Sequence, residues 1–247
     1  MQRPRIIGVI SQKGGVGKTT VAVNLAVALR MMNYKVLLLD GDTSNPTIGI
    51  SLGMEEANIG YKDLVSKKTK VDKLISIHAA SGLHVIPGTL HTKPFVPTKA
   101  QIKRLHGEIA ASGYDFVIID SSPGYYTDYE FSFWDDGLVV STPDMTAITS
   151  CLRLERSFKK VKTKCDLVLN MVRGRRYELR ADEIEEAWGD RILGSLPYDD
   201  SVSAAAAERI PAYLSGKSSP FSKSMRTLAG KYAKGSSRNL RKIFGFR

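Results

Sequence analysis

The chain of 247 residues has little of what defines several protein classes. Its only cysteines are Cys151 and Cys165. They are too few for a disulfide-rich secreted scaffold, and they form no C-x-x-C pair of the kind that holds an iron–sulfur cluster. No stretch approaches the roughly 18 uninterrupted apolar residues of a membrane-spanning helix. The four histidines are scattered, with no pair at metal-ligand spacing, which disfavours a histidine-based metal site.

The first residues also lack the apolar core of a secretory signal peptide, because Met1-Gln-Arg-Pro-Arg5 leads directly into a strand-like run. Hydrophobic residues make up 43% of the chain, which is enough for a sizeable core and excludes wholesale disorder. The length suits one large α/β domain. We therefore expect a cytoplasmic protein.

Acidic residues are absent from the C-terminal end. Ten of the 36 Lys and Arg residues lie after Glu208, where there is no carboxylate at all, which leaves 26 cations against 25 acids in residues 1–208, a net charge of +1. The ten are Arg209, Lys217, Lys223, Arg226, Lys231, Lys234, Arg238, Arg241, Lys242 and Arg247. Basicity confined to one end predicts an anionic partner for that end, either lipid or nucleic acid.

Six short apolar runs are continuous rather than alternating, as in parallel strands that are covered on both faces: 5–10, 35–39, 83–86, 116–119, 137–141 and 166–170. Helical patterns are found at 20–32, 98–112, 145–161 and about 220–233. This alternation predicts an α/β fold with a doubly wound, mostly parallel sheet, which binds ligands at the carboxyl ends of its strands. We expect a single domain over 1–234, followed by a flexible joint and a short amphipathic tail over 235–247.

A phosphate-binding motif, Ser11-Gln-Lys-Gly-Gly-Val-Gly-Lys-Thr-Thr20, follows the first strand and precedes a helix. Its glycines permit positive φ and a close approach of the backbone, so that N–H groups and the positive end of the helix can hold phosphates. A lysine at position 18 can neutralise phosphate oxygens, and the hydroxyl of Thr19 can bind Mg²⁺. The predicted nucleotide-binding residues here are Gly14, Gly15, Val16, Gly17, Lys18, Thr19 and Thr20.

The motif departs from the pattern G-x-x-x-x-G-K-[ST], because Gln12 replaces the first glycine and Lys13 follows it. In this it resembles the deviant Walker A motif of the MinD/ParA family of dimerising P-loop ATPases. The resemblance implies ATP and Mg²⁺ as cofactors, a homodimer that forms with ATP, and hydrolysis that is slow without a stimulating protein partner. It also implies that Lys13 reaches the ATP phosphates of the other protomer.

Two acidic elements extend the resemblance. Leu39-Asp-Gly-Asp42 is similar to the family's D-x-D element, in which Asp42 matches the residue that orients the attacking water and Asp40 the one near the magnesium. The run ending at Asp120 and continuing to Gly124 is similar to Walker B and switch II. The implied catalytic residues are therefore Lys13, Lys18 and Asp42, and the implied metal-associated residues are Thr19, Asp40 and Asp120.

Two later segments match the family's adenine-binding end. Asn170 closes an apolar run and matches the base-reading asparagine, whose amide can both donate and accept a hydrogen bond. Pro197-Tyr-Asp199 resembles the loop that lies over the base, which implies cofactor-binding roles for Pro197 and Asp199.

The final residues indicate which surface such an ATPase would bind. Apolar and cationic side chains are interleaved there, and on a helix one face is shared by Leu240, Ile243, Phe244 and Arg247, with Arg241 and Lys242 flanking it. We predict a membrane-binding tail whose contacts are Leu240, Arg241, Lys242, Ile243, Phe244 and Phe246. A packed C-terminal end and a DNA-binding tail are the alternatives that the sequence leaves open.

The resemblance is nearest to the MinD type within the family. It implies an ATPase that dimerises on ATP, attaches to the inner face of the cell membrane and positions the division site or another cellular structure until hydrolysis releases it. A ParA-like protein that partitions DNA, a relative that places flagella or chemoreceptors, and a nucleotide-binding scaffold without hydrolysis are the other candidates. DNA is the less favoured partner, because residues 1–208 are nearly neutral.

Overall fold

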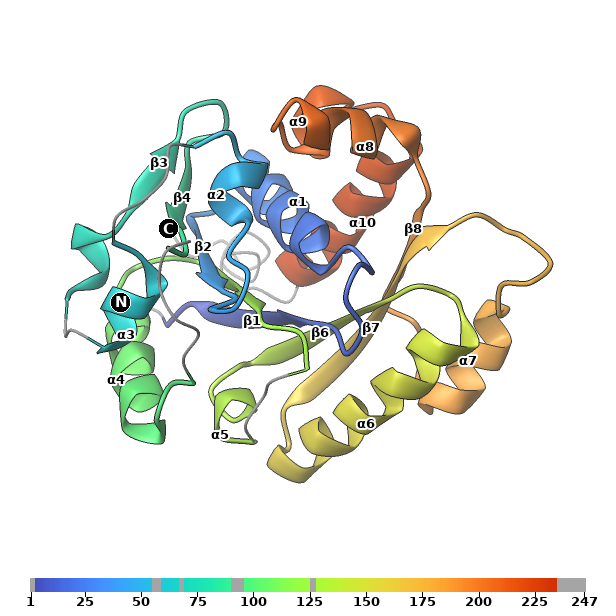
Figure 1. Cartoon of the computed structure of the whole chain (residues 1–247), viewed down its shortest axis with the longest axis horizontal. Coiled ribbons are helices and arrows are strands. Elements are labelled where there is room, and N and C mark those ends of the chain that lie inside the picture. Colours follow the sequence, from blue (N-terminus) through green and yellow to red (C-terminus); the bar gives the residue numbers. More distant parts are fainter. Residues whose placement is uncertain (1–2, 55–58, 67–68, 90–95, 125–127, 235–247) are drawn as a thin grey trace, which may run out of the picture.

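Figure 1 shows the computed structural model of the chain, which describes residues 3–54, 59–66, 69–89, 96–124 and 128–234. An eight-stranded sheet runs through the centre in the order β3-β4-β2-β5-β1-β6-β7-β8. Neighbouring strands pair in parallel, except β3 and β4, which are antiparallel. The strands are β1 (Arg5–Ile10), β2 (Val36–Gly41), β3 (Ser76–His78), β4 (Leu83–Ile86), β5 (Phe116–Ser121), β6 (Asp136–Ser141), β7 (Lys164–Val172) and β8 (Gly194–Pro197).

Helices cover both faces of this sheet (Figure 1). One face carries α1 (Lys18–Met31), α2 (Ile48–Ser51), α8 (Asp200–Ala207), α9 (Ala212–Ser215) and α10 (Pro220–Lys234). The other carries α3 (Tyr61–Ser66), α4 (Lys99–Ala110), α5 (Asp128–Phe131), α6 (Met145–Val161) and α7 (Ala181–Trp188), and a short 3-10 turn, η1, covers Val71–Lys73. Two separate apolar cores result, one on each side of the sheet.

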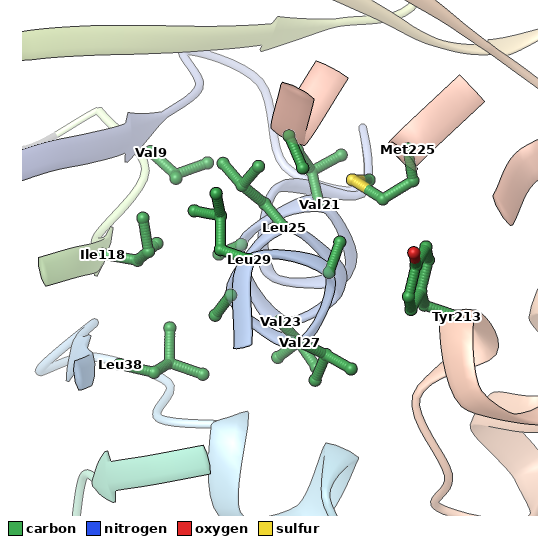
Figure 2. Close-up of a cluster of buried hydrophobic side chains, with 14 of the residues drawn as sticks. Val9, Val21, Val23, Leu25, Val27, Leu29, Leu38, Ile118, Tyr213 and Met225 are labelled. Carbon is green, nitrogen blue, oxygen red and sulfur yellow. The ribbon is translucent and has the colours of Figure 1, made fainter. Parts of the chain in front are cut away.

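The helix α1 is apolar on nearly all sides because it lies between two layers. Figure 2 shows Val9, Leu38 and Ile118 of the sheet on one side of it and Tyr213 and Met225 on the other. All five of these side chains are buried, as is every α1 residue from Val21 to Leu29. A helix enclosed in this way holds the loop at its N-terminal end firmly against the carboxyl edge of the sheet.

The predicted fold class is confirmed: the chain is an α/β protein with a single, mostly parallel sheet between two layers of helices. All six predicted strands are present, and the predicted helices begin and end within two residues of the observed ones. The sequence analysis missed β3 and β8, the two edge strands. The division at residue 234 stays a prediction, because residues 235–247 lie outside the described part of the chain.

Candidate nucleotide-binding site

The position of β1 in the sheet creates a crevice. This strand lies next to β6, and the chain leaves β1 toward β2 on one side of the sheet but leaves β6 toward β7 on the other, so that the loop after β1 opens at a switch point of the sheet. A cavity of about 250 Å³ lies there. Its lining includes seven of the predicted site residues: Gly14, Gly15, Gly17, Lys18, Thr19, Thr20 and Asp42.

The glycine loop has the conformation that phosphate binding requires. Gly15 and Gly17 have φ values of 79° and 84°, in the left-handed region that favours glycine. Gly17 is also constrained by packing, because a Cβ there would lie 2.3 Å from Nδ2 of Asn170. A Cβ built on Gly14 or Gly15 would meet nothing within 4 Å, so the backbone faces open space where phosphate oxygens fit.

The ammonium group of Lys18 is held by the buried carboxylate of Asp120. Lys18 begins α1 and is only 7% exposed, and its Nζ lies 2.6 Å from Oδ1 of Asp120 and 3.9 Å from Oδ2 of Asp42. The hydroxyl of Thr19 donates to the other oxygen of Asp120, also at 2.6 Å. The strand β5 thus delivers Asp120 to the first turn of α1, and the sequence-predicted lysine, threonine and aspartate form one cluster.

Asp42 is oriented by a set of donors that the sequence analysis missed. Its Oδ1 accepts hydrogen bonds from the backbone N–H and hydroxyl of Ser44 at 3.1 and 2.6 Å, and from the N–H of Asn45 at 3.0 Å. The hydroxyl of Ser122, on the loop after β5, adds a fourth at 3.0 Å. An aspartate with Ser and Asn two and three residues later is a common turn pattern, so the signal for Ser44 and Asn45 is present in the sequence. The contribution of Ser122 depends on the tertiary fold.

Two carboxylates stand side by side on neighbouring strands. Asp40 and Asp120 are register partners in the β2–β5 pair and are almost completely buried. Desolvation, together with the charge of Asp120, raises the pKa of Asp40 to about 7. Desolvation also raises the pKa of Asp120, against the opposing influence of Lys18. Asp40 is held in place by the backbone N–H of Ile48, 3.0 Å from its Oδ2.

The oxygen-only donor set fits Mg²⁺. Thr19, Asp40, Asp42 and Asp120 present hydroxyl and carboxylate oxygens, the ligands that this hard cation prefers. In the described residues there is no group of three or more His, Cys, Asp or Glu that could hold a metal. Such a site suits an ion that binds through one or two protein oxygens and completes its shell with phosphate and water oxygens.

Lys13 lies at the outer end of the loop. Its side chain is 48% exposed, and its Nζ is 3.5 Å from Oδ1 of Asp144, at the start of α6. Burial opposes ionisation of Asp144, but hydrogen bonds from Thr142 and Ala147 and the charge of Lys13 lower the pKa of this carboxyl. The structure therefore places Lys13 outside the cavity of its own chain, on the surface.

The three residues predicted for the adenine end have structural partners. The amide of Asn170 is buried and donates to the carbonyl of Val16 at 2.9 Å, so that β7 is tied to the glycine loop. Asp199 caps α8 through the N–H and hydroxyl of Ser201 and accepts a further bond from the N–H of Phe221. The hydrogen bond from Ser201 lowers the pKa of Asp199. Pro197 ends β8. Asn170, Pro197 and Asp199 are not among the residues that line the 250 Å³ cavity, and their base-binding roles stay predictions.

The six predicted membrane contacts, Leu240, Arg241, Lys242, Ile243, Phe244 and Phe246, lie outside the described residues. Where the chain is described, none of its helices combines the length and apolar character that crossing a bilayer requires.

The fold and site define a class of protein, a P-loop nucleotide-binding protein with two carboxylate elements beside its phosphate loop. Residues 7–212 match the CobQ/CobB/MinD/ParA nucleotide binding domain, and the chain belongs to this family. An uncharacterized ATP-binding protein of Methanocaldococcus jannaschii is 34% identical over 230 residues, which cover 91% of this chain and 86% of that protein. The septum site-determining protein MinD of Thermotoga maritima is 30% identical over 240 residues, with the same two coverages.

The fold has close counterparts among solved structures. The septum site-determining protein MinD of Pyrococcus horikoshii, solved in complex with Mg-ADP, superposes with a TM-score of 0.85 at 24% identity, covering 94% of this chain and 96% of that one. The sequence-based recognition of a MinD/ParA-family ATPase similar to MinD is confirmed.

Proposed function

We propose that this protein is a MinD-like ATPase, using ATP and Mg²⁺, whose nucleotide state controls its attachment to a membrane surface. Support comes from the cluster at the start of α1, where Lys18, Thr19 and Asp42 line a cavity bounded by a glycine loop, and Asp120 binds both Lys18 and Thr19. The loop N–H groups and Lys18 bind the phosphates, and Thr19 and Asp120 are the residues that would hold the metal. Bound Mg²⁺ neutralises charge on the phosphate oxygens.

Asp42 is the residue that orients the attacking water. It is anchored by Ser44, Asn45 and Ser122 through one oxygen, which leaves Oδ2 directed toward Lys18 and available to accept a hydrogen bond from water. A carboxylate fixed in this way can position water beside the terminal phosphate without forming a covalent intermediate.

Two copies of the chain close around ATP, and Lys13 of each completes the site of the other. The exposure of Lys13 and its weak 3.5 Å pairing with Asp144 leave this side chain free to turn toward a second protomer. Such a homodimer forms only when ATP is bound, because Lys13 of one protomer contacts the phosphates of the ATP held by the other.

Dimerisation decides whether the tails hold a membrane. A Lys or Arg near anionic lipid contributes about 1 kcal/mol, and a buried Leu or Phe roughly 1.5–3 kcal/mol, less the entropy of ordering the tail. One tail therefore binds weakly and reversibly. Two tails on one dimer gain roughly 10²–10⁴-fold through effective concentration, so that hydrolysis releases the protein.

The cellular role proposed is spatial positioning, most directly of the division site, on the inner face of the membrane. The names of the relatives support it, because the Thermotoga maritima protein is a septum site-determining protein. Slow hydrolysis stimulated by a protein partner would then set the time that each dimer spends on the membrane.

Sedimentation with vesicles tests this function. Phosphatidylcholine vesicles containing an anionic phospholipid are mixed with the protein in the presence of ATP or ADP, and with a variant that ends at Gly235. Only the full chain with ATP is expected to pellet. Equal pelleting in all three conditions would contradict membrane control by nucleotide.

Binding of DNA is a second candidate, favoured by the outer face of α10. Lys223, Arg226, Lys231 and Lys234 are all exposed on this helix, which has no acidic residue. A ParA-like protein would use such a row on DNA phosphates, with affinity that falls steeply as salt increases. Retention on duplex DNA that needs ATP and is lost on Lys223→Glu would favour this candidate over the membrane.

A further inference from the structure

The loop after β1 and the corner between β6 and α6 lie next to each other. β1 and β6 are neighbouring parallel strands, with Ile10 opposite Val139, so the segments that follow them leave the sheet at the same edge. Gln12 and Lys13 come after β1, and Asp144 comes after β6 as the residue that caps α6. The order of the strands therefore brings Asp144 beside Lys13, although the two residues are far apart in the chain.

The helix α6 holds the Gln12–Lys13 segment at two points. The thiol of Cys151 is buried and hydrogen-bonded to the backbone of Gln12. About two turns earlier on the helix, Oδ1 of Asp144 lies 3.5 Å from Nζ of Lys13. Because the first contact fixes the backbone before Lys13, the lysine side chain starts from a defined place and meets the carboxylate from there.

The carboxylate of Asp144 has a fixed position of its own. Its Oδ2 accepts a hydrogen bond from the hydroxyl of Thr142 at 2.5 Å, and its Oδ1 accepts one from the N–H of Ala147 at 2.9 Å. The corner is also tied to the segment before α7, since the N–H of Leu179 donates to the carbonyl of Pro143 at 2.9 Å. Asp144 is therefore a stationary negative charge, whether or not the lysine contacts it.

This contact competes with the role of Lys13 in a second protomer. Lys13 is not among the described residues that line the phosphate cavity, and an ammonium group that rests on Asp144 must leave it to contact the phosphates of another chain. The side chains of Lys13 and Asp144 are 48% and 43% exposed, and an ion pair at such a surface shifts an equilibrium by about 1.5- to 5-fold. A dimer breaks two of these pairs, so its association is weakened by about 2- to 25-fold.

We propose that Asp144 is a positioning residue that holds Lys13 on its own chain and thereby restrains ATP-dependent dimerisation. The inference rests on the proposed function, from which it takes the contact of Lys13 with the ATP of a second protomer. Without ATP, Lys13 stays on Asp144. The phosphates of a bound ATP carry more negative charge than one carboxylate, so the lysine moves to them when two protomers meet.

The reactivity of the lysine tests this contact in the monomer. Asp144→Asn removes the charge and keeps a residue that caps helices equally well. The nucleotide-free, full-length protein is treated with N-hydroxysuccinimide acetate at low salt, and acetylation of each lysine is followed by mass spectrometry. Lys13 is expected to react about 1.5- to 5-fold faster in Asp144→Asn, and the exposed Lys35 at an unchanged rate. Equal rates at Lys13 in the two proteins would overturn the proposal.

A matched control lies at the opposite end of α6, where the ammonium group of Lys160 contacts Asp128. Asp128→Asn is expected to speed acetylation of Lys160 and to leave Lys13 unchanged. Faster acetylation of Lys13 in this control as well would mean that the effect is not local, and it would overturn the proposal. If Asp144→Asn does not fold, Asp144→Ser replaces it, because serine also caps helices well.

Sedimentation equilibrium with Mg²⁺ and adenylyl imidodiphosphate, an ATP analogue that is not hydrolysed, tests the effect on dimerisation. Asp144→Asn is expected to strengthen the dimer by about 2- to 25-fold, and to have no effect when Lys13→Ala is also present. An equal or weaker dimer in Asp144→Asn, or the same gain in the Lys13→Ala background, would overturn the proposal. Absence of any dimer in the unaltered protein would count against the proposed function instead, and the acetylation rates would still decide whether Asp144 holds Lys13.

Discussion

The phosphate end and the adenine end of the candidate site are built in different ways. At the phosphate end, Lys18, Asp40, Asp42 and Asp120 are buried polar groups that lie close together beside or in the lining of a cavity. At the adenine end, the predicted residues serve the fold: Asn170 holds the glycine loop and Asp199 caps a helix.

This difference separates two kinds of evidence. Buried carboxylates with raised pKa, clustered in a crevice, weaken the fold and are explained by a function. A capped helix or a satisfied amide stabilises the fold and needs no further explanation. Substitution of a carboxylate at the phosphate end should therefore change chemistry with little loss of stability, and substitutions at the adenine end should change both.

Asp42→Asn carries the largest expected effect. The amide keeps the shape of the side chain but is a poor acceptor for the water proton, so phosphate release at saturating ATP and Mg²⁺ should fall about 10²–10⁴-fold. ADP affinity and thermal stability should be unchanged. Asp190→Asn, at an exposed position, is the matched control. A hydrolysis rate close to that of the unaltered protein would remove Asp42 from its catalytic role.

Lys18→Gln is expected to weaken nucleotide binding by roughly 10–150-fold, which corresponds to about 1.5–3 kcal/mol for a hydrogen bond to a charged group. The free energy of unfolding should fall as well, because Asp120 loses its buried cation. Calorimetric titration with ADP measures the first effect and urea unfolding the second. The exposed Lys35→Gln should change neither, and equal ADP affinity in both variants would contradict the assignment.

Asn170→Ala tests whether Asn170 both holds the glycine loop and recognises the adenine base. Loss of its bond to the Val16 carbonyl should lower the free energy of unfolding by about 1–3 kcal/mol. If the amide also reads adenine, the ratio of ADP to GDP affinity should fall. Competition binding with the two diphosphates measures this ratio. An unchanged ratio in a folded variant would limit Asn170 to holding the loop.

Asp199→Ala has the smallest expected effect. Removal of the α8 cap should cost about 1 kcal/mol of stability in urea unfolding. Ser201→Ala deletes one hydrogen bond that Asp199 accepts, but it keeps the carboxylate and the capping bond from the Ser201 N–H, so it is a control that alters this turn without removing the group proposed to bind the base. A weaker ADP affinity is expected in Asp199→Ala only. The same ADP affinity in both variants would leave Asp199 with a structural role alone.

The sequence predicts the centre of the sheet well and its edges poorly. The inner strands are continuous apolar runs because helices cover both of their faces, and such runs are visible in sequence. The edge strand β8 is Gly-Ser-Leu-Pro, and β3 has three residues, so neither carries a strand signal of its own. Pairing with β7 and β4 produces these two strands.

Within the site, the residues that belong to motifs at the carboxyl ends of strands could be predicted. Lys18, Asp42 and Asp120 come directly from motifs at the ends of β1, β2 and β5. The hydrogen bond that the Ser122 hydroxyl donates to Asp42 could not be predicted. It joins two loops that are 80 residues apart in the chain and lie together only in the folded protein. The role of Lys13 depends on a second chain, which one sequence does not describe.

A mixing experiment tests the central claim, that two protomers share each ATP site through Lys13. Lys13→Ala and Asp42→Ala are each expected to be inactive alone. Mixed in equal amounts, they form dimers in which one site combines the intact Asp42 of one protomer with the intact Lys13 of the other. The account predicts recovery of about a quarter of the unaltered rate, as random pairing gives. A mixture as inactive as its components would contradict it.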